Sequence, residues 1–181
     1  MRFTEQALSG IYLIDLEERR DDRGFFARTF CAREFAEHGL VARVAQCNLS
    51  YNVHKGTLRG LHFQDLPAAE AKLVRCISGA IHMVVVDRRP GSPTYLRYIG
   101  VDLHAAERRA LYVPELCANG YQTLTGGAEV AYQVSEFYTP ESERGMRYDD
   151  PVLGIAWPLP VTVISDKDRG WPLLEPDGAS R

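Results

Sequence analysis

A succession of short β-type segments constrains the fold more than any other feature of the sequence. The segments are rich in β-branched and aromatic residues, and turn signals separate them. They read GIYLIDL, GFFARTF, VARVAQCNLSY, AKLVRCISG, AIHMVVVD, TYLRYIGVDL, RALYV and EVAYQVSEFY. Regularly spaced short strands are typical of sandwiches and barrels. The pattern therefore predicts an all-β protein, an antiparallel jelly-roll β-sandwich with a few short helices.

Local signals indicate where these segments turn. SGA at 78–80 predicts a tight hairpin, RRPGSPT at 88–94 a longer one, and TGG at 125–127 another. Only AREFAEHG has a clear helical pattern, with Phe35 as its apolar anchor and Gly39 as its stop. The C-terminal part contains four prolines that suit loops or edges better than central strands: Pro151, Pro158, Pro160 and Pro172.

Length and charge limit the class of protein. No linker or repeat divides the 181 residues, so one domain spanning 1–181 is expected. The formal charge of −3 is spread along the chain without a basic block, so nucleic acid is not an expected partner. The first residues lack an apolar run of signal-peptide length, and no later segment has the roughly 20 apolar residues that cross a bilayer. We therefore expect a cytoplasmic protein with no membrane partner.

The four cysteines give little support for a metal site or a disulfide framework. They lie far apart and contain no C-x-x-C pair: Cys31, Cys47, Cys76 and Cys117. We expect four free thiols that are mostly buried.

The stretch TLRGLHFQ at 57–64 places one histidine among bulky apolar residues, with an arginine three positions before it. In a regular strand, side chains alternate between the two faces. One face then carries Leu58, Gly60, His62 and Gln64, and the other carries Arg59, Leu61 and Phe63. A bulge at Gly60 would break this alternation. From these residues alone, His62 is either a packed core histidine or a base beside an anion-binding arginine.

Seven ordered blocks carry a family resemblance that covers nearly the whole chain. They are DDRGFFARTF, QCNLSYNVHKGTLRGLHFQ, EAKLVRCISGAI, VDRRPGSPTY, YVPELCANGYQTL, AYQVSEFYTPESERGMRYDDP and ISDKD. Together they resemble the dTDP-4-dehydrorhamnose 3,5-epimerase family, sugar-nucleotide epimerases with a cupin-like jelly roll. The resemblance implies an isomerase of deoxysugar biosynthesis that needs no cofactor or metal. It also implies a homodimer in which N-terminal strands cross to the partner sheet.

The implied reaction inverts C3, C5 or both of a nucleotide-linked 4-keto-6-deoxy sugar, such as dTDP-4-dehydro-6-deoxyglucose, through an enolate. His62 corresponds to the base, because histidine can accept a proton near neutral pH. Asp168 in SDKD would hold the imidazole in one tautomer. Lys72 would stabilise charge on the C4 oxygen, and Tyr132 would return a proton from the opposite side.

Each of these residues also has a structural interpretation. Asp168 could be a solvated loop charge, Lys72 an edge-strand lysine in water and Tyr132 a packed strand tyrosine. The resemblance extends to a set that binds the nucleotide, its phosphates or the sugar: Arg23, Gln46, Asn48, Arg59, Tyr138, Glu143 and Lys167.

Four positions depart from the family pattern. Asn119 in ANG replaces a histidine that contacts substrate, Met83 stands where aspartate is common, and Cys47 replaces an acidic residue. Arg28 replaces a glutamate that can accept a hydrogen bond from the thymine imide. Arginine offers only donors, which complement acceptor edges of guanine or cytosine. Alternatively, Arg28 turns to a phosphate or to solvent, and thymine still binds.

Three alternatives remain open. The same chemistry could act on a CDP- or GDP-linked 4-keto sugar, or the chain could be a non-catalytic sugar-nucleotide-binding cupin. A metal-dependent cupin oxygenase needs converging histidines and a carboxylate. His54, His82 and His104 are scattered and LHFQ contains no H-x-H pair, so this alternative has weak support.

Overall fold

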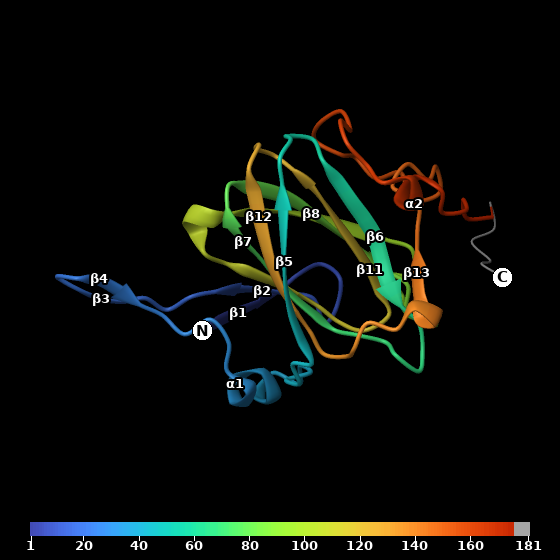
Figure 1. The fold of residues 1–181 in the computed structure, drawn as a ribbon. Helices are drawn as coiled ribbons and strands as arrows, with labels where there is room; N and C mark the ends of the chain where they lie inside the picture. The colour runs from blue at the N-terminus through green and yellow to red at the C-terminus, as the bar shows by residue number, and fades with distance from the viewer. Residues whose placement is uncertain (176–181) are drawn as a thin grey trace.

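The computed structural model describes residues 1–175, and two antiparallel sheets packed face to face form its body (Figure 1). The six-stranded sheet has the order β1 (Arg2–Glu5), β2 (Tyr12–Asp15), β10 (Ala110–Val113), β7 (Lys72–Ser78), β12 (Ala128–Val134) and β5 (Gln46–Asn52). The five-stranded sheet has the order β13 (Glu143–Gly145), β6 (Leu58–Gln64), β11 (Cys117–Thr123), β8 (Ala80–Asp87) and β9 (Tyr98–His104). The predicted fold class, an antiparallel β-sandwich with short helices, is confirmed.

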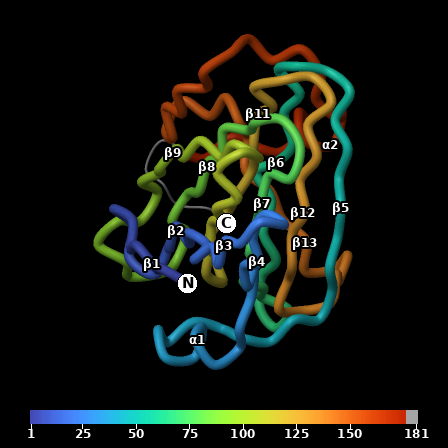
Figure 2. The backbone as a smooth tube through the Cα atoms, turned by 90° about the vertical axis from the view of Figure 1, so that its left-hand side faces the viewer, coloured from blue at the N-terminus to red at the C-terminus, as the bar shows by residue number. Residues whose placement is uncertain are grey.

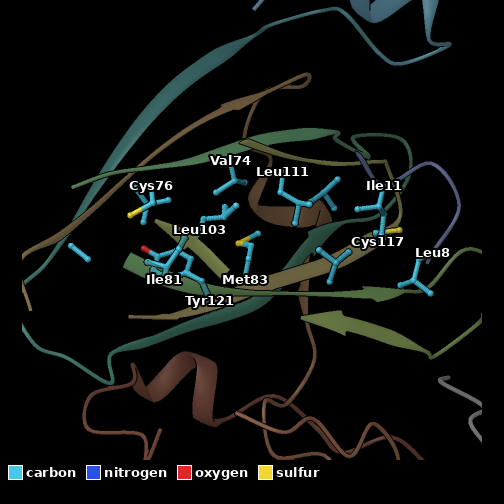
Figure 3. Close-up of a cluster of buried hydrophobic side chains, with 14 residues drawn as sticks. Leu8, Ile11, Val74, Cys76, Ile81, Met83, Leu103, Leu111, Cys117 and Tyr121 are labelled. Atoms are coloured by element: carbon cyan, nitrogen blue, oxygen red, sulfur yellow. The ribbon is translucent and has the colours of Figure 1, made fainter. Parts of the chain in front are cut away.

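The main core lies between the two sheets, where inward side chains from both meet (Figure 3). Strand β8 shows how the sequence builds this core. Ile81, Met83 and Val85 point into it, while the alternate residues Val84 and Val86 belong to a second cluster on the other face of the sheet. A strand that is buried on both faces reads as a continuous apolar run, as AIHMVVVD does.

The N-terminal third supplies the elements that lie outside the sandwich. Strands β3 (Arg19–Asp21) and β4 (Gly24–Phe26) form a hairpin that extends away from the body and is exposed along its length (Figure 1). Helix α1 (Ala32–Glu37) buries Phe35 against the six-stranded sheet, and Gly39 with a positive φ of 69° follows it, as predicted.

Two of the three predicted hairpins are wrong, because the chain changes sheets at those turns. Gly79 follows β7 of one sheet and precedes β8 of the other, and the turn at 125–127 similarly links β11 to β12. The RRPGSPT loop does join paired strands, β8 and β9. Turn chemistry is local, so it does not distinguish a hairpin from a crossing between sheets.

The C-terminal part is irregular, as its prolines predict. Beyond β13 the structure up to residue 175 contains no further strand, only an isolated bridge from Val163 to Thr57 and helix α2 (Asp166–Arg169). The 3₁₀ turns are η1 (Ala105–Glu107) and η2 (Pro140–Ser142). Residues 176–181 lie outside the described part, and the single-domain boundary 1–181 stays a prediction. No helix within 1–175 has the length and apolar character needed to cross a membrane.

The cysteines are free but less buried than expected. Cys76 and Cys117 are buried, Cys31 is half-buried and Cys47 is exposed. Cys47 differs because β5 is an edge strand (Figure 2), and every second residue from Cys47 onward is exposed among the described residues.

Candidate active site

Side chains from both sheets and from the segment 163–168 line a cavity of about 480 Å³. Its inner end meets the core, because Val74, Met83 and Tyr121 belong to both (Figure 3). Of the residues predicted for the site, those that line it are His62, Lys72, Tyr132, Asp168, Arg59, Asn119 and Lys167. A concave space with an apolar floor and several converging polar groups is the usual form of a small-molecule site.

A short polar contact in this cavity joins His62 to Asp168. The imidazole Nε2 lies 2.6 Å from Oδ1 of Asp168, and the backbone N–H of Gly60 donates to Oδ2 at 3.1 Å. The Ser165 hydroxyl caps α2 by accepting from the backbone N–H of Asp168 at 3.1 Å. This bond holds the backbone from which the Asp168 carboxylate extends. Burial alone would raise the pKa of Asp168, but the bonds from His62 and Gly60 outweigh it and lower that pKa.

A bulge in β6 brings Arg59 and His62 to the same cavity. Asn119 pairs with His62, and Tyr121 pairs with Arg59. The advance of three residues from Arg59 to His62 along β6 therefore lies opposite an advance of two residues along β11, which means that β6 has one extra residue there. The regular alternation that would place Arg59 and His62 on opposite faces is therefore broken at Gly60, where the sequence permits a bulge. Gly60 has φ of 109°, and a Cβ there would lie 2.7 Å from Cα of Gly120. Only glycine meets both requirements.

Lys72 and Tyr132 lie on the neighbouring strands β7 and β12, which are paired. The Lys72 ammonium lies 2.9 Å from the carboxylate of Glu70, and both side chains are largely buried. Tyr132 has a raised pKa, chiefly because it is buried, so its phenol is protonated at neutral pH. The edge-strand interpretation of Lys72 is wrong, since β7 is an interior strand of its sheet.

A hydrogen-bonded group that was not predicted from the sequence orients Arg59. Asn52 accepts from Nε of Arg59 at 2.7 Å, and its amide lies 3.4 Å from the hydroxyl of Tyr121. That hydroxyl is 2.7 Å from Oγ of Ser50. The alternation in QCNLSYN could have found Ser50 and Asn52, because Gln46 and every second residue after it are the less exposed ones.

A second polar group lies beside the cavity. The ammonium of Lys167 pairs with the carboxylate of Glu143, which also accepts from the hydroxyl of Tyr138 at 2.8 Å. Gln46 accepts from the backbone N–H of Tyr138 at 2.9 Å. The hydrogen bond to Glu143 raises the pKa of Lys167. Of this group only Lys167 lines the cavity, and Asn48, paired with Tyr132 across the strands, does not line it either.

Two predicted binding residues lie away from the cavity of this chain. Arg23 is on the exposed β3–β4 hairpin and pairs with Asp21. Arg28 is exposed and lies 3.6 Å from the carboxylate of Glu34. Neither residue lines the cavity of its own chain.

The departures from the family pattern fall in different places. Met83 is buried on the cavity floor, and the amide of Asn119 donates to the carbonyl of His62 at 3.2 Å. Cys47 points to the outer face of β5. Among residues 1–175, no group of three or more His, Cys, Asp or Glu side chains is arranged to hold a metal ion.

Comparison with known proteins gives one consistent family. The sequence model of the dTDP-4-dehydrorhamnose 3,5-epimerase family matches residues 5–176. The epimerase of that name from Methanothermobacter thermautotrophicus is 43% identical over 178 residues, which cover 96% of this chain and 95% of the relative.

Solved structures agree. The crystal structure of the enzyme from Elizabethkingia anophelis has a TM-score of 0.94 at 33% identity and covers 99% of both chains. The structure of the Bacillus anthracis enzyme, with TDP and PPi bound, has a TM-score of 0.91 at 38% identity and covers 96% of this chain and 99% of that one. As its motifs predict, the chain therefore belongs to the dTDP-4-dehydrorhamnose 3,5-epimerase family.

Proposed function

We propose that this protein epimerises a dTDP-linked 4-keto-6-deoxy sugar at C3, C5 or both, through an enolate. The observation that carries the proposal is the His62–Asp168 pair, which shares one cavity with Lys72 and Tyr132. An enolate mechanism needs a base, a group that stabilises the C4 oxygen, and an acid. These four side chains can supply all three.

The first step is removal of a proton from a carbon next to the C4 carbonyl. When Nε2–H of His62 donates to Asp168, the lone pair is on Nδ1, which is free to take that proton. The electrons of the C–H bond form a C=C bond to C4, and the π electrons of the carbonyl move onto the C4 oxygen, which gives the enolate. Asp168 stays ionised because its pKa is lowered, so it stabilises the imidazolium that forms.

The negative charge that reaches the C4 oxygen in this first step needs a partner, and the second step returns a proton to the carbon. The ammonium of Lys72 stabilises the developing negative charge. Tyr132 donates its phenolic proton to the carbon from the side opposite the base, which inverts the centre, and recovers a proton from solvent. Its raised pKa keeps that proton available at neutral pH.

The nucleotide and phosphates would lie toward the other polar groups. Arg59 is oriented by Asn52, and a guanidinium matches phosphate oxygens bidentately. Lys167 supplies a second cation, and Glu143 would release it when a diphosphate arrives. Tyr138, which is exposed, offers an aromatic face for the base. The Bacillus anthracis relative, which holds TDP and PPi, supports thymidine as the nucleoside.

The nucleotide can be tested by thermal shift with dTDP, CDP and GDP at matched concentration. A ligand that binds only the folded state raises its stability according to RT ln(1 + [L]/Kd). We expect the largest rise with dTDP, unchanged in Arg28→Ala because the Arg28 guanidinium faces the carboxylate of Glu34 in its own chain. A preference for GDP or CDP that Arg28→Ala removes would instead favour the alternative nucleotide.

We also propose the homodimer that the family resemblance implies. Apolar side chains are exposed on the β3–β4 hairpin and on the outer face of β5: Phe25, Phe26, Leu49 and Tyr51. Crossing of the hairpin to a second copy would cover such surface and carry Arg23 toward the partner's cavity. The cytoplasmic location stays a prediction.

The direct test is incubation in D₂O with a panel of nucleotide-linked 4-keto-6-deoxy sugars, followed by NMR. We expect label at C3, C5 or both of the dTDP-linked sugar, and none with His62→Ala. Binding without any exchange by the wild-type protein would indicate a non-catalytic binding cupin. Metal analysis of the same preparation tests the oxygenase alternative.

A further inference from the structure

Glu70 stands directly behind Lys72 and lies outside the set of cavity-lining residues. Its carboxylate is 2.9 Å from the ammonium, and the two side chains are only 10% and 13% exposed. Glu70 lies two residues before Lys72 in the segment that leads into β7, and the ion pair holds its carboxylate beside the ammonium. The pair therefore lies at the cavity edge with little water around it.

The backbone between the two residues is anchored. The N–H of Ala71 donates to Oγ of Ser135 at 2.8 Å, and the N–H of Ser135 donates to the carbonyl of Ala71 at 3.0 Å. These bonds connect the start of β7 to the end of β12, the strand that carries Tyr132. The sheet therefore sets the backbone positions of Glu70, Lys72 and Tyr132 relative to one another.

The ion pair of Glu70 with Lys72 matters because both side chains are largely buried. A largely buried ammonium without a partner loses several kcal/mol of solvation. Lysine also has a long, flexible side chain that must be held to place its charge at one substrate atom. Both needs are met by a carboxylate on the same backbone segment.

The same carboxylate acts on Tyr132. Burial is the main cause of the raised pKa of this phenol, and the charges of Tyr121 and Glu70 raise it further, while Arg59 lowers it. These residues come from β11, the segment before β7, and β6, with the Lys72 ammonium also lining the cavity. Removing the Glu70 charge should therefore lower the pKa of Tyr132.

We propose that Glu70 is a positioning residue for the epimerase reaction, which aims the Lys72 ammonium at the C4 oxygen and keeps the Tyr132 phenol protonated. The proposal rests on the function proposed above. Glu70 would touch neither the sugar nor the nucleotide and would act through its two neighbours.

The test is Glu70→Gln, which keeps the shape and removes the charge. We expect kcat to fall on the order of tenfold, less than the loss of a direct oxyanion donor, with KM little changed. The alkaline limb of the kcat profile should move to lower pH, because Tyr132 then loses its proton earlier. Glu70→Asp keeps the charge but has a shorter reach, so kcat should fall while the alkaline limb stays close to that of the wild type.

Glu136→Gln is the matched control, since it removes one carboxylate beyond the end of β12 that pairs with Arg43 outside the cavity. It should leave kcat and the pH profile unchanged. Wild-type kcat and an unmoved alkaline limb in Glu70→Gln would overturn the proposal.

A measurement without substrate separates this proposal from the epimerase function. In protein labelled with ¹³Cζ-tyrosine, the Tyr132 signal is assigned by its loss in Tyr132→Phe and then titrated with pH. We expect Tyr132 to titrate at lower pH in Glu70→Gln than in the wild type, and an unchanged titration would overturn the proposal. No exchange by the wild-type enzyme would instead defeat the proposed function. If Glu70→Gln does not fold, the titration of Glu70→Asp against Glu70→Ala decides the point.

Discussion

Asp168 and Glu143 are both carboxylates held ionised beside one cavity, but by different partners. Burial raises the pKa of each, and hydrogen bonds reverse that effect. For Asp168 the donors are His62 and the Gly60 backbone, and for Glu143 they are Lys167 and Tyr138. Asp168 orients the imidazole of His62, whereas Glu143 holds the ammonium of Lys167, which could bind a phosphate group instead.

Asp168→Asn should lower kcat by roughly 10²–10⁴-fold, because an amide can hold the imidazole in the wrong tautomer and does not stabilise the imidazolium. Sugar-nucleotide affinity should change little. Steady-state kinetics and dTDP titration would measure the two quantities. A variant with near-wild-type kcat would remove Asp168 from the mechanism.

Tyr132→Phe should separate proton removal from inversion. Label from D₂O should still enter the sugar, but with retained configuration at the carbon that the phenol reprotonates. Because the pKa of Tyr132 is raised above its ordinary value of 10.0, inversion in the wild type should decline only above that pH. NMR analysis of the product mixture is the measurement, and an unchanged product distribution would exclude Tyr132.

Backbone conformation in β6 decides where its side chains point. The bulge at Gly60 places Arg59 and His62 on one cavity, and the Gly60 N–H supports Asp168. The loop between β8 and β9 depends instead on a buried carboxylate. Asp87 accepts from the guanidinium of Arg89, from Ser92 at 2.6 Å and from Thr94 at 2.6 Å. Both elements can be tested by single substitutions.

Gly60→Ala should destabilise the fold by about 2–3 kcal/mol, because its Cβ would meet the backbone of Gly120 and Asn119 and its φ is positive. Gly91→Ala is the matched control, since Gly91 has φ of 75° with nothing within 4 Å. It should cost about 1 kcal/mol, from strain alone. Urea unfolding would compare them, and equal losses would contradict the close-approach argument.

Asp87→Asn should lower the free energy of unfolding at pH 7 by about 2 kcal/mol, a typical value for bonds to a charged group. Burial would raise the pKa of Asp87, but Arg89, Ser92 and Thr94 lower it overall. A lowered pKa in the folded state gives stability that is present above the ordinary value of 3.8 and is lost as pH falls below it. The difference between wild type and variant should therefore shrink in acid. A difference in the free energy of unfolding that does not change with pH would contradict this role of the Asp87 charge.

For the molecule as a whole, the apolar residues of the hairpin and β5 are exposed within the described residues 1–175, and such surface is typical of an interface. Sedimentation at micromolar concentration should therefore give twice the chain mass of 20.3 kDa. Arg23→Ala should weaken sugar-nucleotide binding through the partner's cavity, while Arg2→Ala, on β1, should not. A stable monomer with full activity would contradict both the dimer and the shared site.

Local patterns in the sequence were enough to predict the strand pattern, the short helix at Phe35, the irregular C-terminal part and the family. Period-two alternation and turn residues are local properties, and the family blocks are read in order along the chain. The alternation in β5 also indicates that Ser50 and Asn52 point inward, although neither residue was predicted for the site.

Which segments meet in space depends on the packing of the whole chain. His62 and Asp168 are 106 positions apart, and their contact depends on α2 folding back onto β6. The turns at Gly79 and 125–127 cross between sheets because each flanking strand pairs with a distant one. The bulge at Gly60 depends on the close approach of Gly120. Such choices are set by packing energies between remote segments, which no local pattern encodes.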